Sequence, residues 1–268
     1  ACTNTSSTAP SPRRTRRMLD RIAILGTGLI GGSLGLAWSQ RRPESTIVGH
    51  DRPDVLTQAE ARGAIHEKAA DPVAAVVDAD AVVLATPLAT TVRLLDTIAA
   101  HLPDGCLVTD VASVKQPVLD QAHDVLPPHV SFLGGHPMAG AEQGGIDHAD
   151  PLLFENAAYV LCLPDGTDRA ALDGALAPLL DLVDASGARP MVLGAERHDR
   201  LVAAVSHVPQ LLAVALVRLA AATDDQDADA SLALELAGGG VRDITRIAES
   251  PFSLGRDRLV GHGGGIPG

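Results

Sequence analysis

The sequence predicts an α/β protein in which a doubly wound, mostly parallel sheet is followed by an all-α helical domain. Two observations support this prediction. From Arg21 to about Pro164, short apolar runs alternate with segments of helical periodicity, which is typical of β-α-β units. After Pro164 the chain consists of Ala/Leu-rich stretches with helical spacing, and no strand is expected there.

The expected strands are near-continuous apolar runs rather than alternating ones, as in parallel strands covered on both faces. They are Arg21–Leu25, Thr46–His50, Ala81–Thr86, Cys106–Asp110, Phe132–Gly135 and Ala158–Leu163. In the second half, helices are expected over Asp168–Ala185, Ala195–Ala222 and Ala230–Glu249. Pro209 should restart or kink the middle helix, because proline cannot donate a backbone hydrogen bond.

The expected organisation has four parts. Residues 1–17 hold four arginines and no acid, which predicts a disordered basic tail, with a transit peptide as the alternative. A dinucleotide-binding domain over 18–165 and a helical substrate and dimerisation domain over 166–260 should follow. The glycine-rich residues 261–268 are expected to be disordered.

Composition narrows the possible partners and location. A net charge of −12 argues against a nucleic-acid or anionic-membrane partner, because such partners require a basic surface. Polar residues interrupt the most apolar stretch, 201–222, so a core helix is expected there rather than a membrane span. Three widely spaced cysteines without a CxxC pair predict no metal site and a reducing, cytoplasmic setting.

A glycine-rich turn directly after the first strand predicts dinucleotide binding. Residues 26–31 read Gly-Thr-Gly-Leu-Ile-Gly and match GxGxxG, in which glycines permit a tight turn and close approach of the pyrophosphate to a helix N-terminus. Asp51 ends the second strand 20 residues after Gly31, where a carboxylate would bind the adenosine ribose. The expected cofactor-binding residues are Gly26, Gly28, Leu29, Ile30, Gly31, Asp51, Arg52, Thr86 and Pro87.

Asp51 favours NAD over NADP, because a carboxylate repels a 2′-phosphate. Arg52 beside it is the residue type that tolerates NADP, although a solvated surface charge is the more ordinary interpretation. NAD is therefore the expected cofactor, and NADP the less favoured one.

Several polar residues follow the expected strands, at the edge where open α/β sheets bind ligands. They include Asp110, Ser113, His136 and, just beyond, Glu142. A histidine in a glycine-rich loop often has only a structural role, in which it hydrogen-bonds within the loop. In a nicotinamide enzyme, however, neutral imidazole suits the proton acceptor that hydride transfer from a hydroxyl requires.

The helical half offers three further candidates. His207 lies in an apolar helix, where a buried structural histidine is the simpler interpretation. Arg242 and Arg246 stand one helical turn apart after three glycines, with Asp243 available to orient one of them. Either could bind a substrate carboxylate, and surface ion pairing is the alternative.

Together these motifs resemble the prephenate/arogenate dehydrogenase family of tyrosine biosynthesis. The matching segments are 26–33, 110–115, 135–142, 153–154, 198–199, 206–209 and 238–248. The resemblance implies NAD-dependent oxidative decarboxylation of prephenate to 4-hydroxyphenylpyruvate by a homodimer, with no metal.

By the same resemblance, His136 accepts the proton of the ring hydroxyl, or hydrogen-bonds it, as hydride leaves C4. Ser113 hydrogen-bonds that hydroxyl or His136. Arg246 binds a substrate carboxylate, His207 lines the substrate pocket, and Glu142 belongs to the substrate site.

Three departures from the family pattern are visible. Gln210 replaces a second histidine, Gly255 replaces a tryptophan, and the chain ends soon after Leu254. These departures predict a less stable and less firmly dimeric protein.

Three alternatives stay open. Arogenate could be the substrate. The chain could be a β-hydroxyacid dehydrogenase, but those enzymes use a lysine in the helical part, and the only lysines here are Lys68 and Lys115. Lastly, it could be a non-catalytic or impaired NAD-binding relative.

Overall fold

The computed structural model describes residues 19–141, 143–163, 174, 176–222, 238–245 and 248. Both expected tails, Glu142, Arg246 and Gly255 lie outside these residues, so the predictions for them stay predictions.

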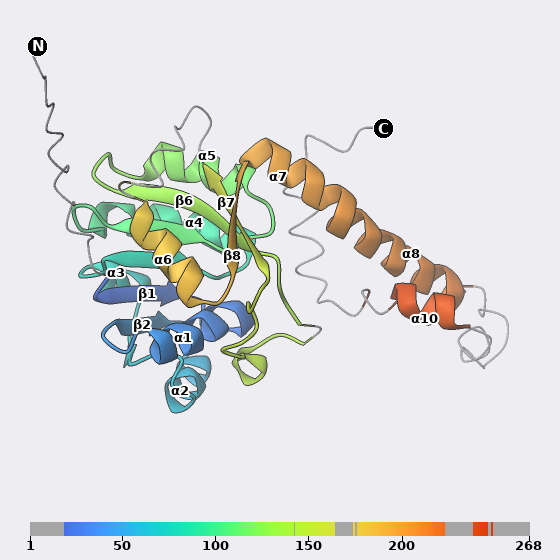
Figure 1. The fold of residues 1–268 in the computed structure, drawn as a ribbon, viewed down its shortest axis with the longest axis horizontal. Helices are drawn as coiled ribbons and strands as arrows, with labels where there is room; N and C mark the ends of the chain where they lie inside the picture. The colour runs from blue at the N-terminus through green and yellow to red at the C-terminus, as the bar shows by residue number, and fades with distance from the viewer. Residues whose placement is uncertain are drawn as a thin grey trace, which may run out of the picture.

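An eight-stranded sheet organises the described chain, with the strand order β3-β2-β1-β4-β5-β6-β7-β8 (Figure 1). All neighbouring strands are parallel except β6 and β7. The strands are β1 Arg21–Leu25, β2 Thr46–His50, β3 Glu67–Lys68, β4 Ala81–Leu84, β5 Leu107–Asp110, β6 Ser131–Pro137, β7 Ala158–Leu163 and β8 Arg189–Gly194. The predicted doubly wound, mostly parallel sheet is confirmed.

Helices cover both faces of this sheet (Figure 1). They are α1 Leu29–Arg41, α2 Pro53–Ala61, α3 Pro72–Val76, α4 Leu88–Ile98, α5 Gln116–Val125 and α6 Ala177–Ala185, with short 3-10 turns at Ala99–His101 and Ile146–His148. The C-terminal part comprises α7 Ala195–Val202, a π-helix Ala203–His207, α8 Val208–Ala222 and α10 Gly239–Thr245.

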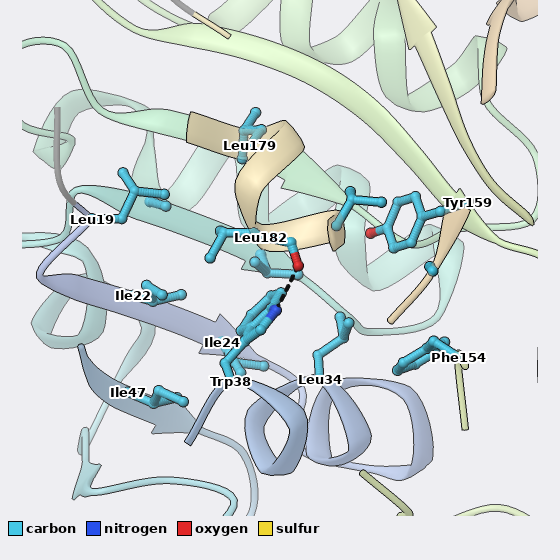
Figure 2. Packing of buried hydrophobic residues seen from close by; sticks show 14 of the residues in the cluster. Leu19, Ile22, Ile24, Leu34, Trp38, Ile47, Phe154, Tyr159, Leu179 and Leu182 are labelled. Atoms are coloured by element: carbon cyan, nitrogen blue, oxygen red, sulfur yellow. Dashed lines mark hydrogen bonds between the residues drawn. The ribbon is translucent and has the colours of Figure 1, made fainter. Parts of the chain in front are cut away.

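Alternation along β1 divides the core into two layers. Ile22 and Ile24 pack in the layer of α1, α2 and α6, whereas Ala23 and Leu25 pack in the layer of α3, α4 and α5. Successive side chains of a strand point to opposite faces, so every second residue enters the same layer. In the first layer the indole of Trp38 donates a hydrogen bond of 2.8 Å to the carbonyl of Leu182 and ties α1 to α6 (Figure 2).

The prediction that no strand follows Pro164 is wrong. Strand β8 pairs in parallel with β7, so the sheet continues to Gly194, past the predicted domain boundary at residue 165. An edge strand is half solvated and tolerates proline. The sequence Arg-Pro-Met-Val-Leu-Gly of β8 has only a short apolar run, Met191–Leu193, and its second residue is Pro190, which argues against a strand in the middle of a sheet. Helix α6, which precedes it, covers the sheet and does not belong to a separate helical domain.

The C-terminal helices form a rod that begins on the sheet and projects away from it (Figure 1). Helix α7 contacts α5, β7 and β8. Pro209 is the second residue of α8, directly after the π-helix, so the predicted interruption is confirmed. The prediction of a core helix is wrong for the single chain, because large apolar side chains of the rod are exposed. These are Leu201, Val205, Val208, Leu212, Val217 and Leu219.

Within the described part of the chain, the helical stretch Ala195–Ala220 is long and apolar enough to cross a membrane, with a mean hydropathy of 1.7. Length and composition alone are weak support for a membrane span.

Candidate active site

The strand order places a topological switch point at the carboxyl end of β1. The chain continues from β1 to β2 on one side, and β4 lies on the other side, so the direction of winding reverses between β1 and β4. Open α/β sheets bind ligands at such a switch point. The loops after β1, β4, β5 and β6 all leave the sheet at this edge because these strands are parallel.

The three glycines of the motif are needed for different reasons. Gly26 has φ of +98°, and a Cβ there would lie 2.5 Å from the carbonyl oxygen of Ala85. A Cβ at Gly31 would collide with the carbonyl oxygen of Gly26. A Cβ at Gly28 would meet no atom within 4 Å. Packing of the protein therefore requires Gly26 and Gly31, whereas Gly28 leaves space open above the start of α1.

Helix α1 begins at Leu29, followed by Ile30, and has neither a side-chain cap nor an acid in its first turn. Its first backbone N–H groups can therefore donate to an anion in the space left by Gly28. The hydroxyl of Thr27 in the same turn is buried and has no hydrogen-bond partner among the described residues. A dinucleotide pyrophosphate fits this space above the start of α1, which we call the dinucleotide cradle.

Asp51 holds the glycine turn against the end of β2. One carboxylate oxygen accepts the N–H of Thr27 at 2.8 Å, and the other accepts the N–H of Arg52 at 2.7 Å. The side chain of Arg52 is exposed and pairs with Asp54 at 3.3 Å, and this hydrogen bond raises the pKa of Arg52. The carboxylate of Asp51 is thus beside the cradle.

On the other side of the switch point, the loop after β4 packs against the glycine turn. A Cβ at Gly26 would also lie 2.8 Å from the methyl group of Thr86. The hydroxyl of Thr86 hydrogen-bonds that of Thr91 at 2.9 Å, and Pro87 is the N-cap residue of α4. The structure therefore brings Thr86 and Pro87 together with the glycine turn, as expected.

A buried ion pair fixes the end of β6. Lys115 and Asp110 are fully buried and paired, and the ammonium also donates to the carbonyl of Gly135. Asp110 in turn accepts the N–H of Gly135 at 3.2 Å and that of Ala112 at 2.9 Å. Both backbone groups of the residue before His136 are therefore held by charged side chains.

His136 lies within β6 rather than after it, and only 9% of its surface is exposed. Its Nδ1 is 2.8 Å from Nε2 of His198, a buried residue of α7. The Nδ1 of His198 is 2.7 Å from a carboxylate oxygen of Asp199. Three side chains in series therefore connect β6 to α7.

Asp199 also accepts two backbone N–H groups at the start of α5. The N–H of Lys115 is 2.8 Å from one carboxylate oxygen, and the N–H of Gln116 is 2.9 Å from the other. Burial alone would raise the pKa of Asp199, but the hydrogen bonds from His198, Gln116 and Lys115 outweigh it, so the pKa is lowered. Asp199 is therefore a carboxylate at neutral pH.

Two further ionisable groups in this region are neutral. Burial raises the pKa of the Cys162 thiol to about 12, against the influence of nearby Lys115. Burial also raises the pKa of Tyr159, helped by the negative charge of Asp110.

The remaining predicted residues are located only in part. Ser113 is half-buried in the loop between β5 and α5. His207 ends the π-helix, and both it and Gln210 are buried. Glu142 and Arg246 lie outside the described residues, as does the side chain of Arg242.

Sequence reasoning did not assign roles to His198, Asp199 or Lys115. The available signals were weak. Lys115 follows Asp110 by five residues, and His198-Asp199 is a polar pair in the first turns of a helix. Their partners are distant in sequence, and His136 and His198 are 62 positions apart.

Comparisons with known proteins agree with this architecture. The family profile described as "Prephenate dehydrogenase, nucleotide-binding domain" matches residues 34–191, and "Prephenate dehydrogenase, dimerization domain" matches residues 194–260. A prephenate dehydrogenase of Bacillus subtilis is 37% identical over 246 residues, and one of Lactococcus lactis is 39% identical over 234. These matches cover 91% and 87% of this chain, which spans 64% and 62% of the two relatives.

Solved structures are similar over most of the chain. Prephenate dehydrogenase of Aquifex aeolicus, in complex with hydroxyphenyl propionate and NAD+, superposes with a TM-score of 0.80 at 29% identity, covering 92% of this chain and 84% of that one. Arogenate dehydrogenase of Synechocystis gives a TM-score of 0.72 at 32% identity, with 91% and 84% covered. The matched profiles and the shared fold confirm the resemblance, and the chain belongs to the prephenate dehydrogenase family.

Proposed function

We propose that this chain is an NAD-dependent enzyme that oxidatively decarboxylates prephenate to 4-hydroxyphenylpyruvate in tyrosine biosynthesis. The observation that carries the proposal is the arrangement at one edge of the sheet. An open dinucleotide cradle at β1 and a buried, hydrogen-bonded histidine at the end of β6 both lie there. The prephenate dehydrogenases at 37% and 39% identity support the choice of substrate.

NAD, when bound, supplies the hydride acceptor. The N–H groups of Gly28, Leu29 and Ile30 bind its pyrophosphate, and Asp51 binds the adenosine ribose. Arg52 is exposed and already pairs with Asp54, which supports NAD rather than NADP. The NAD+ in the Aquifex aeolicus structure supports the same choice.

His136 takes the proton of the hydroxyl at C4 as that carbon is oxidised. Breaking the bond between the ring and its carboxylate releases CO2 and makes the ring aromatic, and the proton can then return to the phenolic oxygen. Ser113 hydrogen-bonds the hydroxyl or His136. Arg246 binds a substrate carboxylate, while His207 and Glu142 line the substrate site, as the family resemblance suggests.

Arogenate is the second candidate substrate, supported by the 32% identity to the Synechocystis arogenate dehydrogenase. The test is NADH formation by the purified protein with prephenate and with arogenate in separate reactions. Faster turnover of prephenate supports the proposal, and faster turnover of arogenate selects the second candidate. NAD binding without turnover of either would identify a non-catalytic relative.

We also propose a homodimer formed through the rod of α7 and α8. Its exposed apolar side chains and the match of residues 194–260 to a dimerization domain support this. A cytoplasmic location is supported by the buried thiols of Cys106 and Cys162, which suit a reducing compartment. The net charge of −12 supports the absence of a nucleic-acid or membrane partner.

A further inference from the structure

The hydrogen bonds around Asp199 determine which nitrogen of His198 carries a proton. Backbone N–H groups of Lys115 and Gln116 can only donate, so both carboxylate oxygens act as acceptors. The Nδ1 of His198 lies 2.7 Å from one of these oxygens and is therefore the donor. A neutral His198 then has its lone pair on Nε2.

The same reasoning extends to His136. The Nε2 of His198 is 2.8 Å from Nδ1 of His136, and the rings meet edge to face at 76°. Because Nε2 of His198 is the acceptor, Nδ1 of His136 must carry the proton. In neutral His136 the unprotonated nitrogen, which can act as a base, is therefore Nε2.

We propose that His198 and Asp199 are positioning residues that hold His136 as the Nδ1–H tautomer and stabilise its imidazolium when Nε2 takes a proton. The chemical part of this assignment rests on the proposed function, in which His136 is the base. The proton from the substrate hydroxyl moves to Nε2 of His136, and the Nδ1–H bond to His198 strengthens as His136 becomes positive. The charge of Asp199, transmitted through His198, offsets that positive charge in a buried site.

The other ionisable groups near His136 and His198 are paired or neutral, so Asp199 is the group that stabilises the positive charge. On the β5–α5 side, Lys115 and Asp110 are paired with each other. On β7, Tyr159 and Cys162 stay neutral because burial raises the pKa of each. Among the described residues, Asp199 is thus the carboxylate that contacts His198.

The first test reads the tautomer directly and needs no activity. In protein labelled with 15N-histidine, one-bond and two-bond proton–nitrogen correlations show which ring nitrogen carries a proton, and His136→Asn assigns the signal. We expect the proton on Nδ1 of His136 near neutral pH. A proton on Nε2 would overturn the assignment. A protein with the Nδ1–H tautomer but no turnover would keep the assignment and refute the proposed function instead.

The second test separates positioning from mere packing. His198→Phe keeps an aromatic ring but removes both hydrogen bonds, whereas His198→Gln can still donate to Asp199 and accept from His136. With prephenate, we expect His198→Phe to lower kcat by roughly 10²-fold, at the low end of the contribution of a positioned base. KM should change little, and the acidic limb of the pH profile should move to lower pH because the imidazolium is less stabilised. His198→Gln should restore most of kcat and of the limb position.

A matched control is His101→Phe, at an exposed histidine outside the site. It should leave kcat and the pH profile unchanged. Equal losses in His198→Phe and His198→Gln, with an unmoved acidic limb, would mean that His198 only fills space. A wild-type kcat in His198→Phe would equally overturn the proposal.

Discussion

Lys115 and Asp110 illustrate at the residue scale how a small polar cluster holds the site. Removing one partner of a buried ion pair leaves an uncompensated charge, which costs about 3–5 kcal/mol. We expect Lys115→Met to lower the free energy of unfolding by about that amount in urea denaturation. Lys68→Met is the control, because Lys68 pairs with Glu60 at 2.6 Å on the exposed surface. The control should cost at most about 1 kcal/mol. Equal losses in the two variants would contradict the structural role of the buried pair.

His136 provides the second residue-scale prediction. His136→Asn keeps a hydrogen-bonding group but cannot take a proton at neutral pH. We expect kcat with prephenate to fall roughly 10²–10⁴-fold, the range for a lost general base. Affinity for NAD+, measured by protein fluorescence or calorimetry, should change little, since the cradle lies at β1 and not at β6. A variant with nearly wild-type kcat would place the base elsewhere.

Sequence reasoning reached this residue scale unevenly. His136 could be singled out as a candidate, because it follows the expected strand and lies among glycines. His198 and Asp199 could not, because their role depends on α7 packing beside α5 and β7. Such contacts between distant segments leave no local pattern in one sequence.

At the scale of elements, most strands could be predicted, because buried parallel strands are apolar along their whole length. The exceptions are the two edge strands. Strand β3 has only two residues, both exposed, and β8 contains Pro190 and is mostly exposed, so neither is a long, buried apolar run. Burial in the sheet centre produces the sequence signal, and its absence at the edges explains both omissions.

The turn between β1 and α1 gives an element-scale prediction that separates folding from binding. Gly28→Ala should keep a near-wild-type melting temperature, because its Cβ meets no protein atom. It should raise the Kd for NAD+ at least about tenfold, which corresponds to about 1.4 kcal/mol of binding free energy. Gly31→Ala should instead lower the melting temperature, because its Cβ collides with the carbonyl oxygen of Gly26. Thermal melts and calorimetric titration of both variants test this. Unchanged NAD+ binding in Gly28→Ala would contradict the proposed cradle.

At the scale of the whole molecule, the exposed rod is the main feature that the single chain leaves uncovered. The sequence predicted an apolar helix over 201–222 but could not show whether its own chain or another copy covers it. Both environments favour the same apolar side chains. The described structure shows that the chain itself leaves Val205 and Leu212 exposed, by 69% and 63%.

The proposed dimer can be tested with one substitution on the rod. Leu212→Glu places a charge in the proposed interface, and twofold symmetry introduces it twice. We expect analytical ultracentrifugation to show a dimer for the wild type and a monomer for Leu212→Glu. Leu152→Glu is the matched control, because Leu152 is 59% exposed but lies outside the C-terminal helices. The control should stay dimeric. A monomeric wild type, or dissociation of both variants, would contradict the assignment of the interface to the rod.

The proposed oxidative decarboxylation can be tested by quantifying both of its products in one reaction. Purified wild-type protein is incubated with NAD+ and prephenate, and NADH and 4-hydroxyphenylpyruvate are quantified in the same reaction, with His136→Asn alongside. We expect the two products to form in equal amounts and both to disappear largely in the variant. Without NADH formation by the wild type, or with NADH that is not matched by 4-hydroxyphenylpyruvate, the proposed function would be wrong.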